Sequence, residues 1–247
     1  MKVSEKPVVL LTGAARRVGR VLARTLHGAG YDVALHYRQS QGEAEQLAAE
    51  LEHARADSTL LLAGELADMA ALPKLVLRTV QRFGRLDALV NNASAFFPTA
   101  VGDTSEAQWD ELFASNAKGP YFLAQAAAPH LRVANGCIVN LVDIYAERPL
   151  ARHPVYCMAK AALAMMTKAL ALELGPAVRV NGVAPGAIAW PEDGQFPEAE
   201  RQRIIATTPL GRPGSPEDIA RAVAFFAGAP YVTGQILAVD GGRSVFI

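Results

Sequence analysis

The stretch PVVLLTGAARRVG, residues 7–19, joins a run of aliphatic residues to a turn of small residues and two arginines. The run is apolar on both faces, as expected of a strand in a parallel sheet that helices cover on each side. Gly13 and Gly19 let the backbone turn into a helix whose first N–H groups can face a phosphate. A glycine-bearing turn has this form without any ligand, but the amphipathic helix that follows favours a dinucleotide site.

The same pattern of strand, turn and helix recurs along the chain. Short aliphatic or β-branched runs lie at 7–12, 31–37, 58–64, 86–91, 136–142, 178–184 and 235–240. Segments with helical spacing lie at 17–29, 41–54, 68–83, 105–132, 153–175 and 216–228. The alternation predicts an α/β fold, a Rossmann-like doubly wound sheet of seven parallel strands with helices on both faces.

The chain length of 247 residues fits one domain of this kind, spanning residues 1–247. Residues 186–215 are rich in Pro and Gly and predict an irregular lid over a site. Ligands of doubly wound sheets bind beyond the carboxyl ends of the strands. We therefore look for site residues directly after each predicted strand.

Composition excludes several classes of protein. The 24 acidic residues balance the 24 basic ones, so the chain lacks the field of a nucleic-acid or anionic-membrane binder. Cys137 and Cys157 provide neither a disulfide framework nor a zinc site, and the histidines have no metal-binding spacing. We therefore expect a protein without a metal in the reducing cytoplasm. We also expect it to be soluble, since even the apolar run 161–174 is broken by Lys168 and Glu173.

The second predicted strand ends in HYRQS, residues 36–40, without the carboxylate that binds the ribose 2′-hydroxyl in NAD enzymes. Arg38 and Ser40, with Arg16 or Arg17, offer a cation and a hydroxyl that suit a 2′-phosphate. This favours NADPH over NADH. The alternative is that Arg38 is an ordinary solvated loop residue.

Two further turns predict contacts to the rest of the cofactor. Glu65, after the third strand, can accept a hydrogen bond from the adenine amino group, although an acidic residue at this place is often only a cap. Asn91-Asn92-Ala93-Ser94, after the fourth strand, offers amides and small residues where the backbone must pass close to a ribose and nicotinamide.

Tyr156 and Lys160 lie four residues apart on the predicted helix 153–175, so they stand on one face. A lysine ammonium beside a phenol lowers the pKa of the phenol, which predicts Tyr156 as a proton donor near neutral pH. Such a pair also arises by chance in packed helices. Its position after Asp143, which ends the fifth predicted strand, favours catalysis.

The motifs occur in a set order along the chain: Thr12-Gly13 with Gly19, Asn91-Asn92-Ala93, Asn116, Tyr156 with Lys160, and Pro185-Gly186. In this order they resemble the short-chain dehydrogenase/reductase family over nearly the whole chain. The resemblance implies that Tyr156 is the acid, that Lys160 also binds the nicotinamide ribose, and that Asn116 supports a proton-relay water. It also implies a homotetramer joined through the helices at 105–132 and 153–175 and the C-terminal edge.

Three departures from the family pattern resemble its pteridine reductase subgroup. Arg17 replaces the second loop glycine, Asp143 replaces the catalytic serine, and Ser94-Ala95-Phe96-Phe97 extends the asparagine motif. The resemblance implies that Arg17 reaches a heterocycle above the cofactor phosphate and that Asp143 passes a proton to Tyr156. Phe96 would stack on a pterin and Ser94 would bond its edge, while Phe97 is expected only to pack.

The sequence thus predicts three sets of site residues. The cofactor-binding set is Gly13, Arg16, Arg17, Val18, Gly19, His36, Tyr37, Arg38, Gln39, Ser40, Glu65, Leu66, Asn92, Ala93, Ser94, Tyr156, Lys160, Pro185, Gly186, Ala187 and Ile188. The catalytic set is Asp143, Tyr156, Lys160 and Asn116, and the substrate set is Arg17, Ser94, Phe96, Asp143, Tyr156 and, in the lid, Trp190.

The expected reaction is hydride transfer from NADPH to a dihydropterin, such as dihydrobiopterin, dihydromonapterin or dihydrofolate, to give the tetrahydro form. One alternative is a reductase of 3-oxoacyl or other carbonyl substrates, against which Asp143 and Phe96 argue. A second alternative is a silent NADPH-binding sensor, since a fold does not determine function. The intact Tyr156, Lys160 and Asn116 argue against that alternative.

Overall fold

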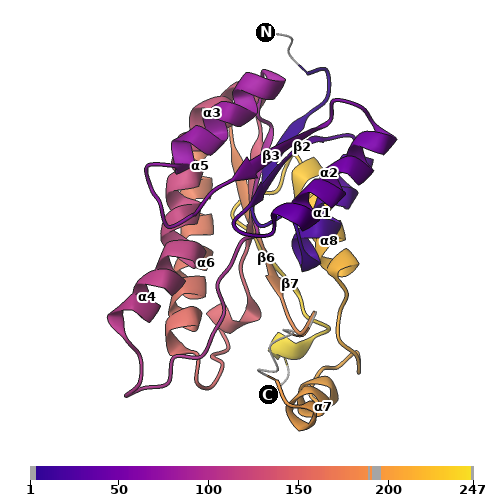
Figure 1. Ribbon diagram of the computed structural model, residues 1–247. Coiled ribbons are helices and arrows are strands. Elements are labelled where there is room, and N and C mark those ends of the chain that lie inside the picture. The colour runs from indigo at the N-terminus through magenta and orange to yellow at the C-terminus, as the bar shows by residue number, and fades with distance from the viewer. Residues whose placement is uncertain (1–3, 189, 191–195, 246–247) are drawn as a thin grey trace.

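Seven strands form one parallel sheet in the computed structural model, which describes residues 4–188, 190 and 196–245 (Figure 1). The strands are β1 (Val8–Leu11), β2 (Asp32–Tyr37), β3 (Thr59–Ala63), β4 (Ala88–Asn91), β5 (Cys137–Leu141), β6 (Arg179–Pro185) and β7 (Ile236–Val239). Their order is β3-β2-β1-β4-β5-β6-β7, and every pairing is parallel. The predicted doubly wound sheet is confirmed.

Helices cover both faces of the sheet, with α1, α2 and α8 on one side and α3, α5 and α6 on the other (Figure 1). The helices are α1 (Arg17–Gly28), α2 (Gln41–Ala54), α3 (Leu72–Phe83), α4 (Glu106–Phe113), α5 (Gly119–Ala134), α6 (Pro154–Leu174), α7 (Glu198–Ala206) and α8 (Pro216–Gly228). Because the winding reverses between β1 and β4, a crevice opens at the carboxyl ends of these two strands.

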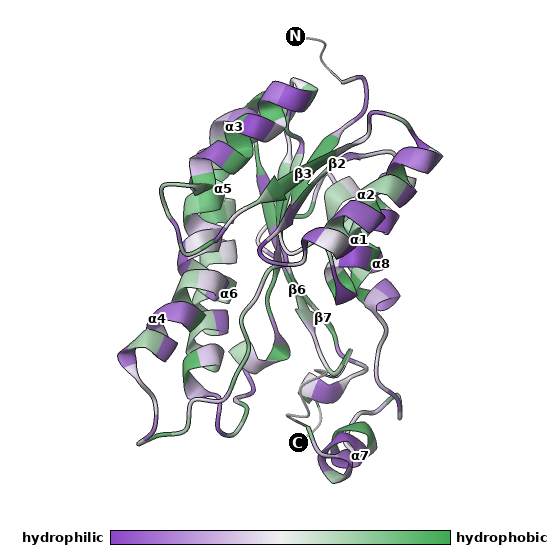
Figure 2. Ribbon diagram, viewed as in Figure 1, coloured by the Kyte–Doolittle hydropathy of each residue, from purple (hydrophilic) through white to green (hydrophobic). Residues whose placement is uncertain are grey.

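Successive side chains of β1 point to opposite faces of the sheet, so the core has two layers. Val9 and Leu11 pack into the layer under α1 and α8, whereas Val8 and Leu10 pack into the layer under α3 and α5. All four side chains are completely buried. Figure 2 shows the same arrangement as green strands between helices whose outer stripes are purple. This two-sided burial explains why the strands read as continuous apolar runs.

The segment predicted as one helix, 105–132, is divided in the structure. A π-helical turn, Ala114–Lys118, separates α4 from α5. Gly119 follows it and packs so closely that an added Cβ would lie 2.9 Å from the carbonyl oxygen of Leu66. The wider turn lets the helix continue past this contact, and π-helical turns of this kind are frequent at functional sites.

The predicted lid is partly helical. Helix α7 lies within 186–215 and was not predicted, because its residues are mostly polar and only Ile204 is buried. Residues 189 and 191–195 of the lid lie outside the described part of the chain.

Among the described residues, α6 alone is long and apolar enough to match a membrane-spanning helix by length and composition. Half of its most apolar stretch is buried, and it packs against β6. A core helix of a globular domain passes the same test of length and composition.

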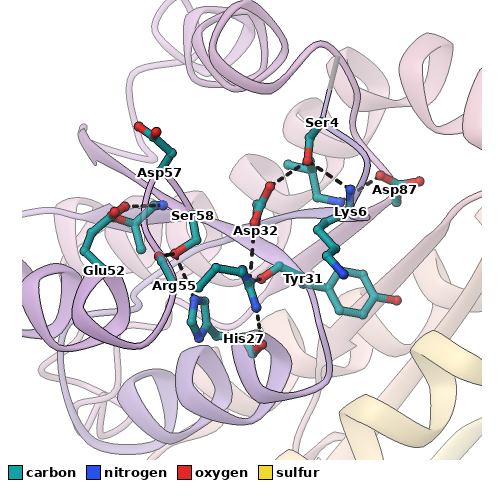
Figure 3. A network of polar contacts seen from close by, with 12 residues as sticks. Ser4, Lys6, His27, Tyr31, Asp32, Glu52, Arg55, Asp57, Ser58 and Asp87 are labelled. Carbon is teal, nitrogen blue, oxygen red and sulfur yellow. Dashed lines mark hydrogen bonds and ion pairs between the residues drawn. The ribbon is translucent and has the colours of Figure 1, made fainter. Parts of the chain in front are cut away.

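A partly buried ion pair ties the start of β2 to the end of α2, at the edge of the sheet away from the carboxyl ends (Figure 3). Arg55 Nη2 lies 3.3 Å from Asp32 Oδ1, and the Asp32 side chain is only 9% exposed. Ser4 Oγ donates to the other Asp32 oxygen at 2.7 Å, while Arg55 also donates to the backbone carbonyls of His27 and Tyr31. One arginine thus holds the ends of α1 and α2 against the sheet.

Replacement of Arg55 by alanine is expected to lower the free energy of unfolding by about 2–3 kcal/mol, because it leaves the Asp32 carboxylate buried without its cation. The matched control is Arg82→Ala, since Arg82 pairs at 3.1 Å with Asp57, whose side chain is 91% exposed. That change is expected to cost about 1 kcal/mol or less. Urea unfolding followed by circular dichroism measures both, and equal losses would contradict this interpretation.

Candidate active site

The carboxyl ends of the strands surround one cavity of about 1120 Å³. Every residue of the predicted cofactor and substrate sets lines it, from Gly13 in the first turn to Trp190 in the lid. The predicted catalytic residues Asp143, Tyr156 and Lys160 line it as well, whereas Asn116 does not. No group of acidic, histidine or cysteine side chains that could hold a metal ion occurs among the described residues.

The first turn is built tightly against the end of β4. Thr12 Oγ1 accepts hydrogen bonds from the backbone N–H groups of Asn92 and Ala93 at 2.9 and 3.0 Å. Gly13 has a φ of +63°, and an added Cβ would lie 3.0 Å from Ala93 Cα. A Cβ on Gly19 would lie only 2.0 Å from the carbonyl oxygen of Gly13. The glycines therefore leave room for backbone, and the cradle they form at the start of α1 suits a pyrophosphate.

Arg17 begins α1 with a φ of +50°. An L-residue in this left-handed region costs about 1–2 kcal/mol, and glycine avoids that cost. The strained backbone places the Arg17 side chain on the cavity wall. Strain held at a site of this kind supports a functional role for the side chain.

His36 joins the turn after β1 to the turn after β3. Its Nε2 lies 3.2 Å from the carbonyl oxygen of Gly64, and its Nδ1 lies 3.3 Å from the backbone nitrogen of Gly13. The carbonyl requires a hydrogen on Nε2, so Nδ1 is left to accept from Gly13 N–H. Burial lowers the pKa of His36 to about 4. A neutral His36 therefore braces the glycine turn.

Arg38 projects from the end of β2 toward two carboxylates. Its Nε lies 2.5 Å from Glu65 Oε2, and its Nη1 lies 3.9 Å from Glu111 Oε1 on α4. Glu65 was predicted to bind adenine and Arg38 to bind a phosphate, but here they pair with each other. All three side chains are more than two-fifths exposed, so the ion pairs are weak and can be exchanged for a ligand.

Tyr156 and Asp143 form the centre of the site. The Tyr156 hydroxyl donates a 2.7 Å hydrogen bond to Asp143 Oδ2, and the backbone N–H of Tyr145 donates to Asp143 Oδ1 at 2.9 Å. Lys160 Nζ donates at 2.8 Å to the carbonyl oxygen of Leu141 and lies 5.7 Å from the centre of the Tyr156 ring. The ammonium thus faces the edge of β5 and the phenol ring.

Burial dominates the ionisation of this group. It raises the pKa of Asp143 to about 6, against the opposing hydrogen bonds from Tyr145 and Tyr156. It also lowers the pKa of Lys160 to about 8, against the pull of Asp143. The pKa of Tyr156 is raised well above its usual value, first by burial and then by the negative charge of Asp143. The expected net lowering of the Tyr156 pKa is therefore not found in the protein without cofactor.

Asn116 lies in the π-helical turn and is completely buried. Its Nδ2 donates to the carbonyl oxygens of Ala95 and Leu112 at 2.9 and 3.0 Å, and its Oδ1 accepts from Ser94 Oγ at 2.7 Å. Its side chain therefore acts on the cavity through Ser94 and Ala95 and does not face it.

The aromatic wall of the cavity is larger than predicted. Phe96 stacks on His153 with ring centres 4.7 Å apart and meets the edge of Tyr156 at 4.8 Å. Its ring is also parallel to that of Phe196, 6.1 Å away. Phe196 follows the undescribed part of the lid and has Trp190 at 5.6 Å. Phe96, which the sequence predicted to stack on a pterin, is thus parallel to two other rings of the chain.

Several residues of the cavity were missed. Phe97 packs beside Phe96, as expected, but it also lines the cavity. Tyr145 and Phe196 line it near Asp143 and the lid, and Lys118 and Glu111 line it from the side of α4. Position directly after a strand identified Asp143, and the same criterion extended by two residues would have included Tyr145.

Comparison with known proteins agrees with this geometry. A family model described as enoyl-(acyl carrier protein) reductase matches residues 13–244. The chain belongs to the short-chain dehydrogenase/reductase family.

Among its relatives is pteridine reductase 1 of Leishmania tarentolae, 37% identical, with 97% of this chain and 96% of that protein aligned. A putative ketoacyl reductase 2 of granaticin polyketide synthase from Streptomyces violaceoruber is also 37% identical, over 96% of both chains. A 3-oxoacyl-(acyl-carrier-protein) reductase of Staphylococcus aureus is 35% identical, over 94% of this chain and 96% of its own. This chain is therefore an oxidoreductase of the family, and its substrate has to be inferred from the site.

The ionisation of Asp143 provides a test of the site. We expect its carboxyl to titrate with a pKa of about 6 in the protein without ligands. Tyr156→Phe removes a hydrogen bond that stabilises the carboxylate, so the pKa of Asp143 should rise further. Carbon-13 NMR of labelled aspartate measures both, with Asp143→Asn to assign the signal. A wild-type value near 4, or a fall in the variant, would contradict the geometry.

Proposed function

We propose that this protein is an NADPH-dependent pteridine reductase that converts a dihydropterin to its tetrahydro form. The observation that carries the proposal is the partly buried hydrogen bond from Tyr156 to Asp143, with the pKa of Asp143 raised to about 6. A ring nitrogen must gain a proton as hydride reaches the adjacent carbon. A carboxyl that is partly protonated near neutral pH can supply that proton through Tyr156.

The residues in the turns after β1, β2 and β3 suit NADPH, which would supply the hydride. Added side chains at Gly13 and Gly19 would fill the cradle at the start of α1, and glycine leaves that space for a pyrophosphate. Arg38 and Ser40 line the same cavity after β2. Binding of a 2′-phosphate there would replace Glu65 as the partner of Arg38 and free Glu65 for the adenine amino group.

The chain's own residues account for the proton and the orientation. Lys160 would bind the nicotinamide ribose, and its cationic charge would stabilise the Tyr156 phenolate that remains after proton transfer. Asp143 would then return a proton to Tyr156 across their 2.7 Å hydrogen bond. Once Phe196, which lies parallel to Phe96 in the structure, has moved aside, Phe96 and Arg17 would hold a flat heterocycle against the cofactor. Orientation of this kind would supply much of the acceleration.

A carbonyl reductase is the second candidate. It is favoured by ketoacyl and 3-oxoacyl reductases that match this chain as closely as the pteridine reductase does. Asp143 argues against it, because a buried carboxylate repels the alkoxide-like oxygen of such a reaction, whereas a serine hydroxyl donates a hydrogen bond to it.

We further propose a cytoplasmic homotetramer. Large apolar side chains are exposed on α5 and α6, including Tyr121 at 43%, Met165 at 64% and Leu172 at 87%. Such a surface is typical of a subunit interface. Sedimentation of the purified protein at a concentration near that used for activity measures the oligomer, and a monomer would exclude it.

The experiment mixes the protein with NADPH and dihydrobiopterin, dihydromonapterin or dihydrofolate and follows absorbance of the reduced nicotinamide. We expect oxidation of NADPH with at least one of them, faster than with NADH, and little with an acetoacetyl thioester. Tyr156→Phe should lower the rate by about 10²-fold or more. Turnover of the thioester without turnover of any pterin would overturn the proposal in favour of the carbonyl reductase.

Arg17→Gly separates substrate binding from folding. Glycine accepts the φ of +50° without strain, so the variant should be at least as stable to heat as the wild type. Loss of the guanidinium should raise KM for the dihydropterin by about tenfold, the effect of losing one charged contact. An unchanged KM would mean that Arg17 does not touch the heterocycle.

A further inference from the structure

The segment 94–99, which we call the Phe96 segment, has no regular secondary structure and carries Phe96 across the cavity wall. Its amino end is held by the π-helical turn, since Asn116 Nδ2 donates to the carbonyl oxygen of Ala95 and Ala95 N–H donates to Ser115 Oγ. Its other end is held by the start of α6, the helix that carries Tyr156. An irregular segment is thus fixed at both ends.

Thr99 makes the contacts at the second end. Its backbone N–H donates to the carbonyl oxygen of Arg152 at 2.7 Å, and its Oγ1 accepts from the backbone N–H of Val155 at 3.4 Å. Thr99 is 1% exposed. Arg152 presents its carbonyl to Thr99 from a left-handed conformation, with a φ of +66°.

The second of these bonds replaces a helix cap. Val155 is the second residue of α6, where the backbone N–H has no partner within the helix, and the N-cap residue His153 makes no capping bond through its side chain. Thr99 supplies the missing oxygen from another segment of the chain. The Phe96 segment is therefore the cap of the helix that carries Tyr156 and Lys160.

His153 adds a second contact at the same junction. Its Nδ1 donates to the carbonyl oxygen of Ala151 at 2.9 Å, which fixes the plane of the imidazole. Phe96 stacks on that plane with an angle of 11° between the rings, and its own plane meets Tyr156 at 85°. His153 is 8% exposed and does not line the cavity, so it acts through Phe96.

We propose that Thr99 and His153 are positioning residues that set the ring of Phe96 relative to the Tyr156 hydroxyl. This inference rests on the proposed function, because it assumes that a flat substrate ring takes the place of Phe196 against Phe96, opposite His153. Thr99 fixes where the Phe96 segment meets α6, and His153 fixes the tilt of the Phe96 ring. Together they hold the substrate plane at a constant height above the proton donor.

Two pairs of variants test the proposal. Thr99→Val keeps the volume and the backbone bond to Arg152 but loses the oxygen that caps α6, whereas Thr99→Ser keeps the oxygen. His153→Asn keeps a donor for Ala151 but loses the ring, whereas His153→Phe keeps a ring and loses the donor. The Thr99 pair compares loss of the capping oxygen with its retention, and the His153 pair compares loss of the stacked ring with loss of the bond to Ala151 alone.

The measurements are KM and kcat for the dihydropterin that the wild type reduces and Kd for NADPH from its fluorescence. Rates are divided by the concentration of NADPH-binding sites, so that misfolded protein does not lower the calculated kcat. We expect Thr99→Val and His153→Asn to raise KM for the pterin by about tenfold, because a small misplacement of a ring costs this much or more. Thr99→Ser and His153→Phe should stay within about threefold of the wild type, and Kd for NADPH should change in none of them.

The outcomes are distinguishable. If Thr99 and His153 only stabilise the fold, Thr99→Val and His153→Asn will lose NADPH-binding sites and melt at lower temperature, but KM for the pterin will stay at the wild-type value, and the proposal fails. A Thr99→Ser variant as impaired as Thr99→Val would also overturn it. If the wild type reduces no pterin, the proposed function fails first, and the inference fails with it.

Discussion

The site depends on one hydrogen bond, from the Tyr156 hydroxyl to the Asp143 carboxylate, formed in the partly buried wall of the cavity. Burial opposes the charge of Asp143 and raises its pKa to about 6, while burial and then the charge of Asp143 raise the pKa of Tyr156. Neither group would behave in this way at the surface. The pair holds a proton between two oxygens, and Asp143 can supply a proton at a pH where an isolated aspartate is ionised.

The fold supplies this environment through its parallel sheet. Asp143 follows β5, Tyr156 and Lys160 stand on α6, and Leu141 at the end of β5 accepts the hydrogen bond from Lys160. Since α6 packs against the sheet, the distance between the helix and β5 is fixed by core residues. The Phe96 segment then closes the site by contacts to α6 and the π-helical turn.

The sequence was sufficient for the sheet because strands buried on both faces are continuous apolar runs, and the cavity followed from the rule that ligands lie at the carboxyl ends. Helix α7 was missed because its polar residues bury only Ile204. The pairing of Arg38 with Glu65 was missed because each was assigned to a ligand, although both follow neighbouring strands. The stack of Phe96 on His153 joins positions far apart in the chain and has no local sequence pattern.

The central claim is that the carboxyl of Asp143 directs the chemistry toward a ring nitrogen. The most direct test compares kcat/KM for a dihydropterin with kcat/KM for an acetoacetyl thioester, in the wild type and in Asp143→Ser. The account predicts that the wild type prefers the pterin and that serine lowers pterin reduction by about 10²-fold or more, with no comparable loss on the thioester. An Asp143→Ser enzyme that reduces the pterin at the wild-type rate would contradict it.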